Sequence, residues 1–116
     1  MNDLDIPIFK KAYELYKLFH EYRKVVSKQD RFTIFERCEN LIMEVTEGVI
    51  KAGTEPKTVK VATLEHTSLK LNMLRVFIRL MKDVKVIDNK KYVTIENIVD
   101  EMGRMLGGWI KASKAV

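Results

Sequence analysis

Basic side chains with helical spacing are the residues of this sequence best placed to do chemistry. Arg75, Arg79 and Lys82 recur at intervals of four and three residues, which on an α-helix puts them in one stripe about 60° wide. Guanidinium and ammonium groups in such a stripe suit a nucleic-acid backbone, and they bind its phosphates in a salt-sensitive and largely sequence-independent way. The alternative is a solvated helix face neutralised by Asp83 and Asp100.

The charge distribution bears on the same choice. Six more basic residues follow the stripe towards the C-terminus, and five of them are further candidates for phosphate contacts: Lys85, Lys90, Lys91, Arg104 and Lys111. The chain has 116 residues and a formal net charge of +5. Residues 1–56 hold 9 basic and 10 acidic side chains, whereas residues 57–116 hold 12 basic and 6 acidic ones. This asymmetry suits a polyanionic partner such as RNA or DNA for the C-terminal half, and a basic surface that serves only solubility is the alternative.

No arrangement typical of a catalytic site or a metal centre occurs in the sequence. The residue three positions before each histidine is not a glutamate, which excludes the Glu-x-x-His pairs of a di-iron bundle. His20, His66 and Cys38 do not have zinc-type spacing, and phosphate-loop and nucleophile-elbow motifs are absent. We expect no enzymatic activity, no metal and no cofactor. Cys38 should lie in the core, and the histidines in packing or surface positions.

Helices are predicted to position these residues. The composition is 47% hydrophobic and 32% charged, with two prolines and five glycines, which is typical of a helical protein with few turns. Apolar residues recur at intervals of three and four in four segments. With short connections between them, these segments predict an all-α, up-down-up-down four-helix bundle in a single domain. The predicted helices span residues 6–26, 28–53, 57–85 and 89–114.

Capping residues mark the predicted helix ends. Asp5, Ser27 and Asp88 each precede a segment with helical spacing, and short polar side chains of this kind cap the free N–H groups of a first turn. At the other end of the second helix, Gly53 suits the position just beyond the last helical residue. Pro56 then prevents the helix from continuing.

The first and third helices carry more apolar surface than one bundle core requires. Phe9, Tyr13 and Tyr16 fall on one side of the first helix, and Leu15 falls on another. From Leu71 onward the apolar arc of the third helix spans about 220°, whereas a core-facing stripe needs little more than about 100°. We expect another copy of the chain to bury the excess, which gives a homo-oligomer.

Three glycines stand in the last predicted helix, where each costs about 1 kcal/mol against alanine. Gly103, Gly107 and Gly108 are flanked by the only tryptophan, Trp109. The usual reason for such glycines is the close approach of another backbone. We therefore expect Gly103, Gly107, Gly108 and Trp109 to be packing residues in a tight helix assembly.

The sequence also predicts a location. No apolar run approaches the 18 residues of a membrane span, and the acidic N-terminal residues do not resemble a signal peptide. The single cysteine fits a reducing compartment. A cytoplasmic protein without a membrane partner is expected.

One family resembles this chain over nearly its whole length. Glu101–Lys111 is similar to the C-terminal helix signature of Avd, the accessory variability determinant of diversity-generating retroelements. Leu74–Leu80 is similar to the family in its pattern of apolar and basic positions, and Ile87–Tyr92 resembles the turn before the last helix. Pro7–Tyr13 and Asp30–Phe32 resemble the starts of the first two helices.

This resemblance implies a four-helix bundle that assembles as a ring-like homopentamer with a basic surface. Avd proteins have no known enzymatic activity. They partner the retroelement reverse transcriptase and bind nucleic acid during mutagenic retrohoming. Arg75, Arg79 and Arg104 match basic positions of the family pattern. Residues 33–37 depart from it, because many relatives have a glycine there.

Two other functions stay open at this point. Proteins encoded in intervening sequences of large-subunit ribosomal RNA genes have a similar bundle and an obscure role, but lack so full a Gly-Arg-x-Leu-Gly-Gly-Trp run. An oligomeric scaffold that binds no nucleic acid is the third possibility.

Overall fold

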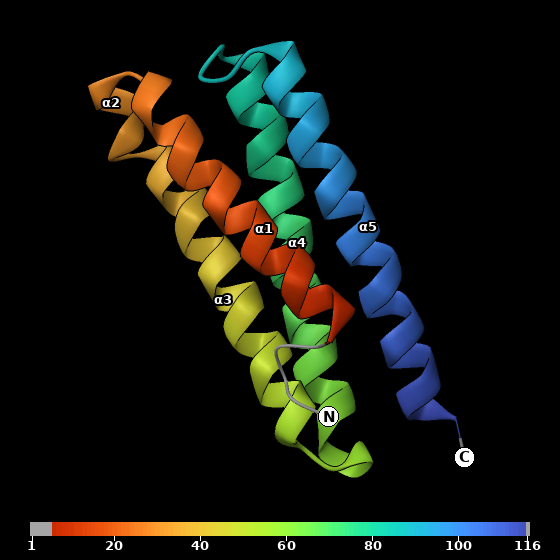
Figure 1. Cartoon of the computed structure of the whole chain (residues 1–116). Coiled ribbons are helices and arrows are strands. Elements are labelled where there is room, and N and C mark those ends of the chain that lie inside the picture. The colour runs from red at the N-terminus through yellow and green to blue at the C-terminus, as the bar shows by residue number, and fades with distance from the viewer. Residues whose placement is uncertain (1–5, 116) are drawn as a thin grey trace.

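Four long helices form the body of the molecule, for which the computed structural model describes residues 6–115. Consecutive long helices run in opposite directions and close into an up-down-up-down bundle, so the predicted all-α fold is confirmed (Figure 1). Helix α1 packs on α3 and α5, and α4 packs on the same two helices. The long helices are α1 (Pro7–Tyr22), α3 (Ile34–Thr54), α4 (Lys57–Asp83) and α5 (Asn89–Lys114).

Two short elements, η2 (Arg23–Val25) and α2 (Lys28–Arg31), connect α1 to α3. They lie at the same end of the bundle as the turn between α4 and α5, at the top of Figure 1. We call this the upper end, and we call the end that holds the α3–α4 turn the lower end. Within the described range, none of the helices combines the length and apolar character that a bilayer span demands.

Two of the three predicted caps are present. The Ser27 hydroxyl accepts the backbone N–H of Asp30 at 3.3 Å, and the Asp88 carboxylate accepts that of Lys91 at 2.8 Å. The third predicted cap, Asp5, lies outside the described residues, and Ile6 stands at the cap position of α1.

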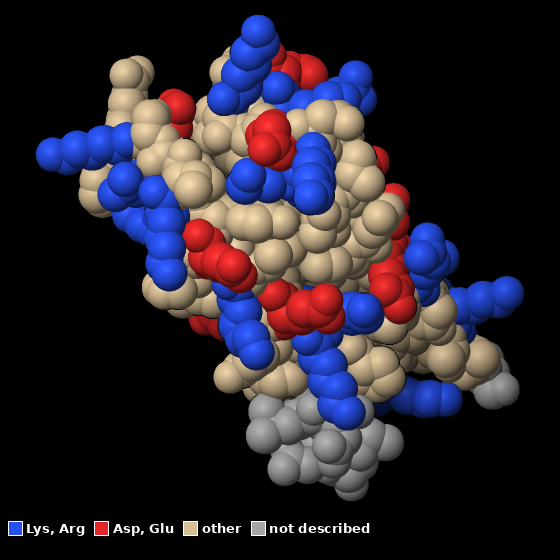
Figure 2. All heavy atoms as spheres, turned by 45° about the horizontal axis from the view of Figure 1, so that its top comes forward, with Lys and Arg blue, Asp and Glu red and all other residues tan. Residues whose placement is uncertain are grey.

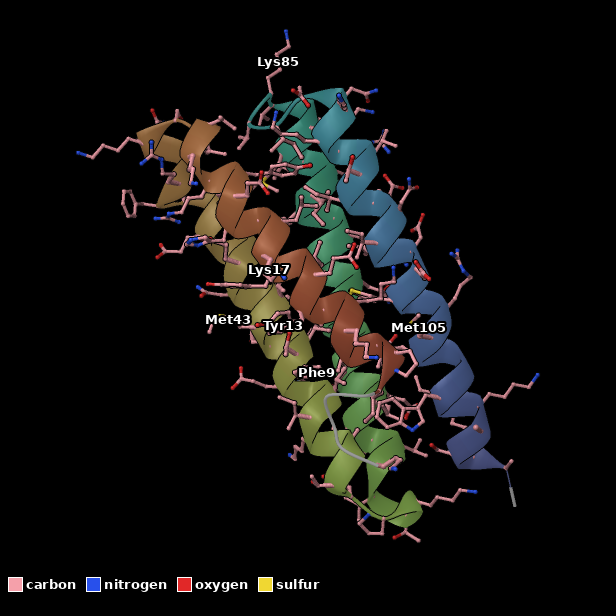
Figure 3. The ribbon with its side chains drawn as sticks, viewed as in Figure 1. Phe9, Tyr13, Lys17, Met43, Lys85 and Met105 are labelled. Atoms are coloured by element: carbon pink, nitrogen blue, oxygen red, sulfur yellow. The ribbon has the colours of Figure 1, made fainter. Side chains whose placement is uncertain are left out.

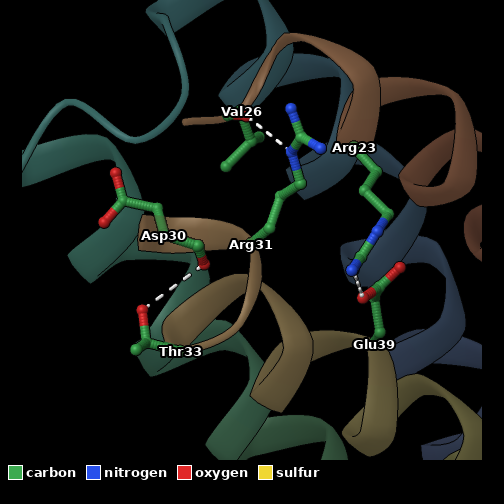
Figure 4. A network of polar contacts seen from close by, with 6 residues as sticks. All are labelled: Arg23, Val26, Asp30, Arg31, Thr33 and Glu39. Atoms are coloured by element: carbon green, nitrogen blue, oxygen red, sulfur yellow. Dashed lines mark hydrogen bonds and ion pairs between the residues drawn. The ribbon is translucent and has the colours of Figure 1, made fainter. Parts of the chain in front are cut away.

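The second predicted helix, 28–53, is wrong as a continuous element. Helix α2 ends at Arg31. Thr33 then interrupts the helical backbone, with φ −122° and ψ −105°, before α3 begins. The Thr33 hydroxyl donates to the carbonyl of Gln29 at 3.0 Å, and it thereby competes with the backbone for an acceptor. Arg31 Nε also donates to the carbonyl of Val26 at 2.9 Å, which holds α2 against the end of η2 (Figure 4).

The expected role of Gly53 is also wrong, because this residue lies inside α3 and has no positive φ. Helix α3 ends one residue later, and Pro56 forms the cap position of α4. The left-handed residue is instead Lys85, with φ 64°, just after α4. Its N–H donates to the Lys82 carbonyl at 3.1 Å, and Val86 N–H donates to Met81 at 2.8 Å. This is a Schellman ending with lysine at the position that glycine usually takes.

The core follows the predicted apolar spacing. On α3, the residues predicted from three/four spacing are all buried: Phe35, Cys38, Leu41, Ile42, Val45, Val49 and Ala52. Phe9 and Leu15 of α1 are buried as well, whereas Tyr13 and Tyr16 stay exposed on the outer side of that helix. Helix α4 likewise leaves Val76 exposed. The apolar surface that exceeds one core is therefore present on α1 and α4.

Gly48 marks the closest helix approach at a glycine. A Cβ added there would lie 3.1 Å from the Cβ of Thr67 and would overlap the Thr67 hydroxyl. Thr67 is buried on α4, where its hydroxyl donates to the carbonyl of Thr63 at 2.8 Å. Gly48 thus allows α3 and α4 to meet at this level.

Candidate nucleic-acid interface

Arg75 connects α4 to α5 at the centre of the candidate surface. Its Nη1 forms an ion pair with Asp100, and its Nη2 donates to the carbonyl of Val99 at 3.3 Å. Arg75 keeps 35% of its side-chain surface exposed. The guanidinium is therefore fixed by α5 and still open to solvent along part of its surface.

Gly103 makes room for that guanidinium, since a Cβ at this position would overlap Nη2 of Arg75. The close neighbour of Gly103 is thus a side chain, and not the backbone that we expected. Gly107 and Gly108 are exposed, and an added Cβ would meet no atom of the described chain within 4 Å. The expected packing of Gly107 and Gly108 within the bundle is wrong, because both lie on an exposed face of α5. Trp109 does pack against the core, half-buried, with Lys60 Nζ 5.4 Å from its ring.

Arg79 and Lys82 continue the stripe one and two turns further along α4. Arg79 Nε lies 3.5 Å from Asp83, and both side chains are more than half exposed. An exposed pair of this kind contributes under about 1 kcal/mol, so a phosphate can replace the carboxylate. Lys82 Nζ lies 4.7 Å from the centre of the Tyr92 ring on α5.

A pocket of about 310 Å³ lies between the two helices beside these cations, and Arg75, Arg79, Tyr92 and Glu96 contribute its polar lining. The Glu96 carboxylate raises the pKa of Tyr92 through its interaction with the phenol, and desolvation adds to this effect. Tyr92 therefore stays protonated near neutral pH and keeps a hydroxyl donor. Two guanidiniums at this pocket match the acceptor oxygens of a phosphate, whereas the Glu96 carboxylate, which already engages the Tyr92 hydroxyl, disfavours an anion.

Three lysines lie at the upper end beyond the stripe. Lys85 projects from the α4–α5 turn away from the bundle (Figure 3), and Lys90 is exposed on the first turn of α5. Lys91 Nζ lies 3.0 Å from the Asp88 carboxylate. The backbone N–H and then the ammonium of Lys91 lower the pKa of Asp88.

Arg104 and Lys111 are not brought to the same place. Both are exposed on α5, but Lys111 lies about 30 Å from Lys90 along the helix at 1.5 Å per residue. Figure 2 shows Lys and Arg side chains around the upper end with Asp and Glu between them. The predicted basic residues of α4 and α5 are therefore spread along the bundle and do not form a single patch.

The sequence reasoning missed a second group at the α1–α3 connection. Arg23 Nη1 lies 2.8 Å from the Glu39 carboxylate (Figure 4). Its guanidinium lies 5.2 Å from the centre of the Phe32 ring. Phe32 is 57% exposed. Burial raises the pKa of Glu39, although Arg23 opposes this shift. An aromatic residue at the end of the basic segment 28–31 was the available signal.

Within residues 6–115, the histidine, cysteine and acidic side chains do not form a cluster that could hold a metal ion. His20 and His66 are exposed. Cys38 is buried in the core, and burial raises the pKa of its thiol to about 12. The thiol is therefore protonated and poorly reactive.

Comparison with family models matches residues 7–113 to the family described as bAvd-like. The matched segment contains every residue of the α4–α5 surface and of the α1–α3 connection. No curated protein matches the chain.

Proposed function

The chain belongs to the bAvd-like family, and on that premise we propose that it is a non-enzymatic accessory protein of a diversity-generating retroelement. It binds RNA and DNA through the exposed basic residues of α4 and α5 and partners the reverse transcriptase. Its site of action is the cytoplasm. The observation that supports nucleic-acid binding most strongly is the position of Arg75, which α5 holds in place beside Arg79 and an open pocket.

Preorganisation is the physical reason why this arrangement favours binding. A guanidinium fixed by Val99 and Asp100 loses little side-chain entropy when a phosphate arrives. Arg79 and Lys82 supply further charge along the same side of α4. Phosphate contacts of this kind carry affinity without reading bases, which suits an accessory protein that meets both template RNA and its cDNA.

We further propose that the protein acts as a homo-oligomer, with the pentamer of the resembling family as the expected state. On α1 and α3, Tyr13, Lys17 and Met43 lie close together (Figure 3) and line a largely apolar groove of about 430 Å³. On α4, Val76 is 64% exposed. Packing of Gly107 and Gly108 against a second copy remains a prediction. A monomeric mass by light scattering at micromolar concentration would rule out this assembly.

A scaffold that binds no nucleic acid is the second candidate. The observation in its favour is that acidic residues already pair with two cations of the stripe, Arg75 with Asp100 and Arg79 with Asp83.

Titration with RNA and with DNA at several salt concentrations separates the two functions. The proposal predicts binding to both polymers, with an affinity that falls steeply as salt rises. A protein that binds neither polymer at low salt would be the scaffold. Co-purification with the reverse transcriptase of the same element tests the partnership independently.

A further inference from the structure

A series of cation–aromatic pairs crosses the upper end of the bundle and leads away from the α4–α5 surface. Within residues 6–115, three such pairs lie at this end, and each joins different elements. The first links α4 to α5, the second links α5 to α1, and the third links η2 to the turn after α2. The pairs are Lys82 with Tyr92 at 4.7 Å, Lys91 with Tyr22 at 5.6 Å, and Arg23 with Phe32 at 5.2 Å.

The Arg23–Phe32 pair has the most exposed aromatic ring of the three, and an ion pair holds its cation in place. Arg23 is fixed by its 2.8 Å ion pair with Glu39, whose residue surface is only 8% exposed. The guanidinium therefore forms a support for the Phe32 ring, while 57% of Phe32 remains open to solvent. A single exposed phenylalanine is common on protein surfaces, but a fixed guanidinium backs this ring, so a ligand with a flat apolar face is its natural complement.

Basic residues are frequent in the segment that carries this ring. The segment 23–32 contains four basic residues and one acidic residue: Arg23, Lys24, Lys28, Arg31 and Asp30. Asp30 accepts the Ser27 hydroxyl at 2.8 Å and keeps its charge, so four basic residues minus one acidic residue give the segment a net charge of +3 before the pairing of Arg23 with Glu39 is counted. Lys24 and Lys28 are both exposed. The segment therefore presents net positive charge beside an open aromatic ring.

We propose that this corner, formed by Arg23, Lys24, Lys28 and Phe32, is a second nucleic-acid contact that stacks an unpaired base on Phe32. Positive charge attracts the backbone, and the ring accepts the π-face of a base of any sequence. In a duplex that face is buried by stacking, so the corner selects single-stranded or unpaired segments. Lys24 and Lys28 favour a nucleic acid over a protein partner, since lysine is depleted from protein interfaces although phenylalanine and arginine are enriched there. This inference rests on the proposed function and adds a strand preference to it.

The test compares a single-stranded oligonucleotide with its own duplex. Affinities of the whole protein and of Phe32→Leu and Phe32→Tyr are measured by fluorescence anisotropy at several salt concentrations. Phe32→Leu should weaken single-strand binding about fivefold or more, with the duplex affinity and the salt slope unchanged. Phe32→Tyr should retain the single-strand affinity because it keeps the ring.

Leu69→Ala is the control. Leu69 is 55% exposed on α4 and lies outside both the corner and the groove lined by Tyr13, Lys17 and Met43. This variant should bind as the unmodified protein does. Light scattering on every variant checks that the assembly is the same.

Three outcomes would overturn the proposal. If Phe32→Leu leaves single-strand affinity unchanged, the corner does not stack bases, and the proposed function stands. Equal losses on single strand and duplex would remove the strand preference. If the unmodified protein binds neither form at low salt, the proposed function fails and this inference fails with it.

Discussion

The guanidinium of Arg75 occupies the space beside Gly103 that a Cβ would fill. This contact explains one of the glycines of α5, since the missing side chain lets Arg75 reach Val99 and Asp100. It also makes Arg75 a link between two helices as well as a candidate phosphate ligand. The charge that Arg75 offers to a ligand is set by its ion pair with Asp100.

Neutralising Asp100 should therefore strengthen binding. In Asp100→Asn the side chain keeps its size but no longer offsets the charge of Arg75, so affinity for RNA should rise roughly two- to fivefold at low salt. Arg75→Ala should change it in the opposite direction. Because the ion pair is more than one-third exposed, its coupling energy in a double-mutant cycle should stay under about 1 kcal/mol. Unchanged RNA affinity in Asp100→Asn would show that the Arg75–Asp100 pair is not part of the interface.

Gly48 should tolerate substitution less well than Gly107 of α5. Gly48→Ala forces a methyl group against the buried Thr67 and should cost about 1–3 kcal/mol of unfolding free energy. Gly107→Ala is the matched control, because it faces open space and alanine gains up to about 1 kcal/mol in an exposed helix. Chemical denaturation measures both. Equal effects at the two positions would contradict the packing described at Gly48.

Acid should weaken the contact between α3 and α4 at Glu44. Its carboxylate lies 3.1 Å from Lys70 and 3.2 Å from Arg37, and the hydrogen bond from Lys70 is the main reason why its pKa lies below the usual 4.5. A lowered pKa in the folded state stabilises the protein above pH 4.5, and this contribution is lost as the pH falls through the folded pKa.

Glu44→Gln should accordingly lose less stability than the unmodified protein when the pH is lowered below 4.5. Thermal unfolding across this range measures the difference, and Glu47→Gln on the same helix is the control. Parallel stability curves for Glu44→Gln and the unmodified protein would show that Glu44 does not contribute.

The left-handed backbone at Lys85 should lower the stability of the folded protein. Its left-handed φ of 64° costs a non-glycine residue about 1 kcal/mol. Lys85→Gly should raise the unfolding free energy by roughly 0.5 kcal/mol after the greater freedom of glycine in the unfolded chain is deducted. It should also weaken nucleic-acid binding, since it removes a cation. A lower unfolding free energy for Lys85→Gly would show that the backbone at Lys85 is not strained. Unchanged nucleic-acid affinity would show that Lys85 is not part of the interface.

Local sequence signals predicted much of the fold. Apolar spacing located the long helices, because burial of one helix face depends on residues close together in the chain. The predicted caps located the start of the short helix α2 at Ser27 and the start of α5 at Asp88. The break at Thr33 was missed because its hydroxyl could equally have faced solvent in a continuous helix. The end of α3 was placed at Gly53, although proline alone stops it.

The site was less accessible to sequence reasoning because its contacts join distant segments. The pairing of Arg75 with Asp100 depends on which faces of α4 and α5 meet, and the spacing within α4 does not determine that. For the same reason, no pattern within α5 distinguishes Gly103, which faces a guanidinium, from Gly107, which faces open space. Phe32 could not be paired with Arg23 before the break after α2 was known.

The central claim is that Arg79 and Lys82 on α4 contact nucleic-acid phosphates, and the salt dependence of RNA binding tests it most directly. The double variant Arg79→Ala/Lys82→Ala should lower affinity across unrelated sequences and reduce the slope of log affinity against log salt by about two. The control Lys10→Ala/Lys57→Ala removes the same charge from exposed positions at the lower end and should keep most of that slope. Equal slopes in the two variants would contradict a phosphate-binding surface on α4 and α5.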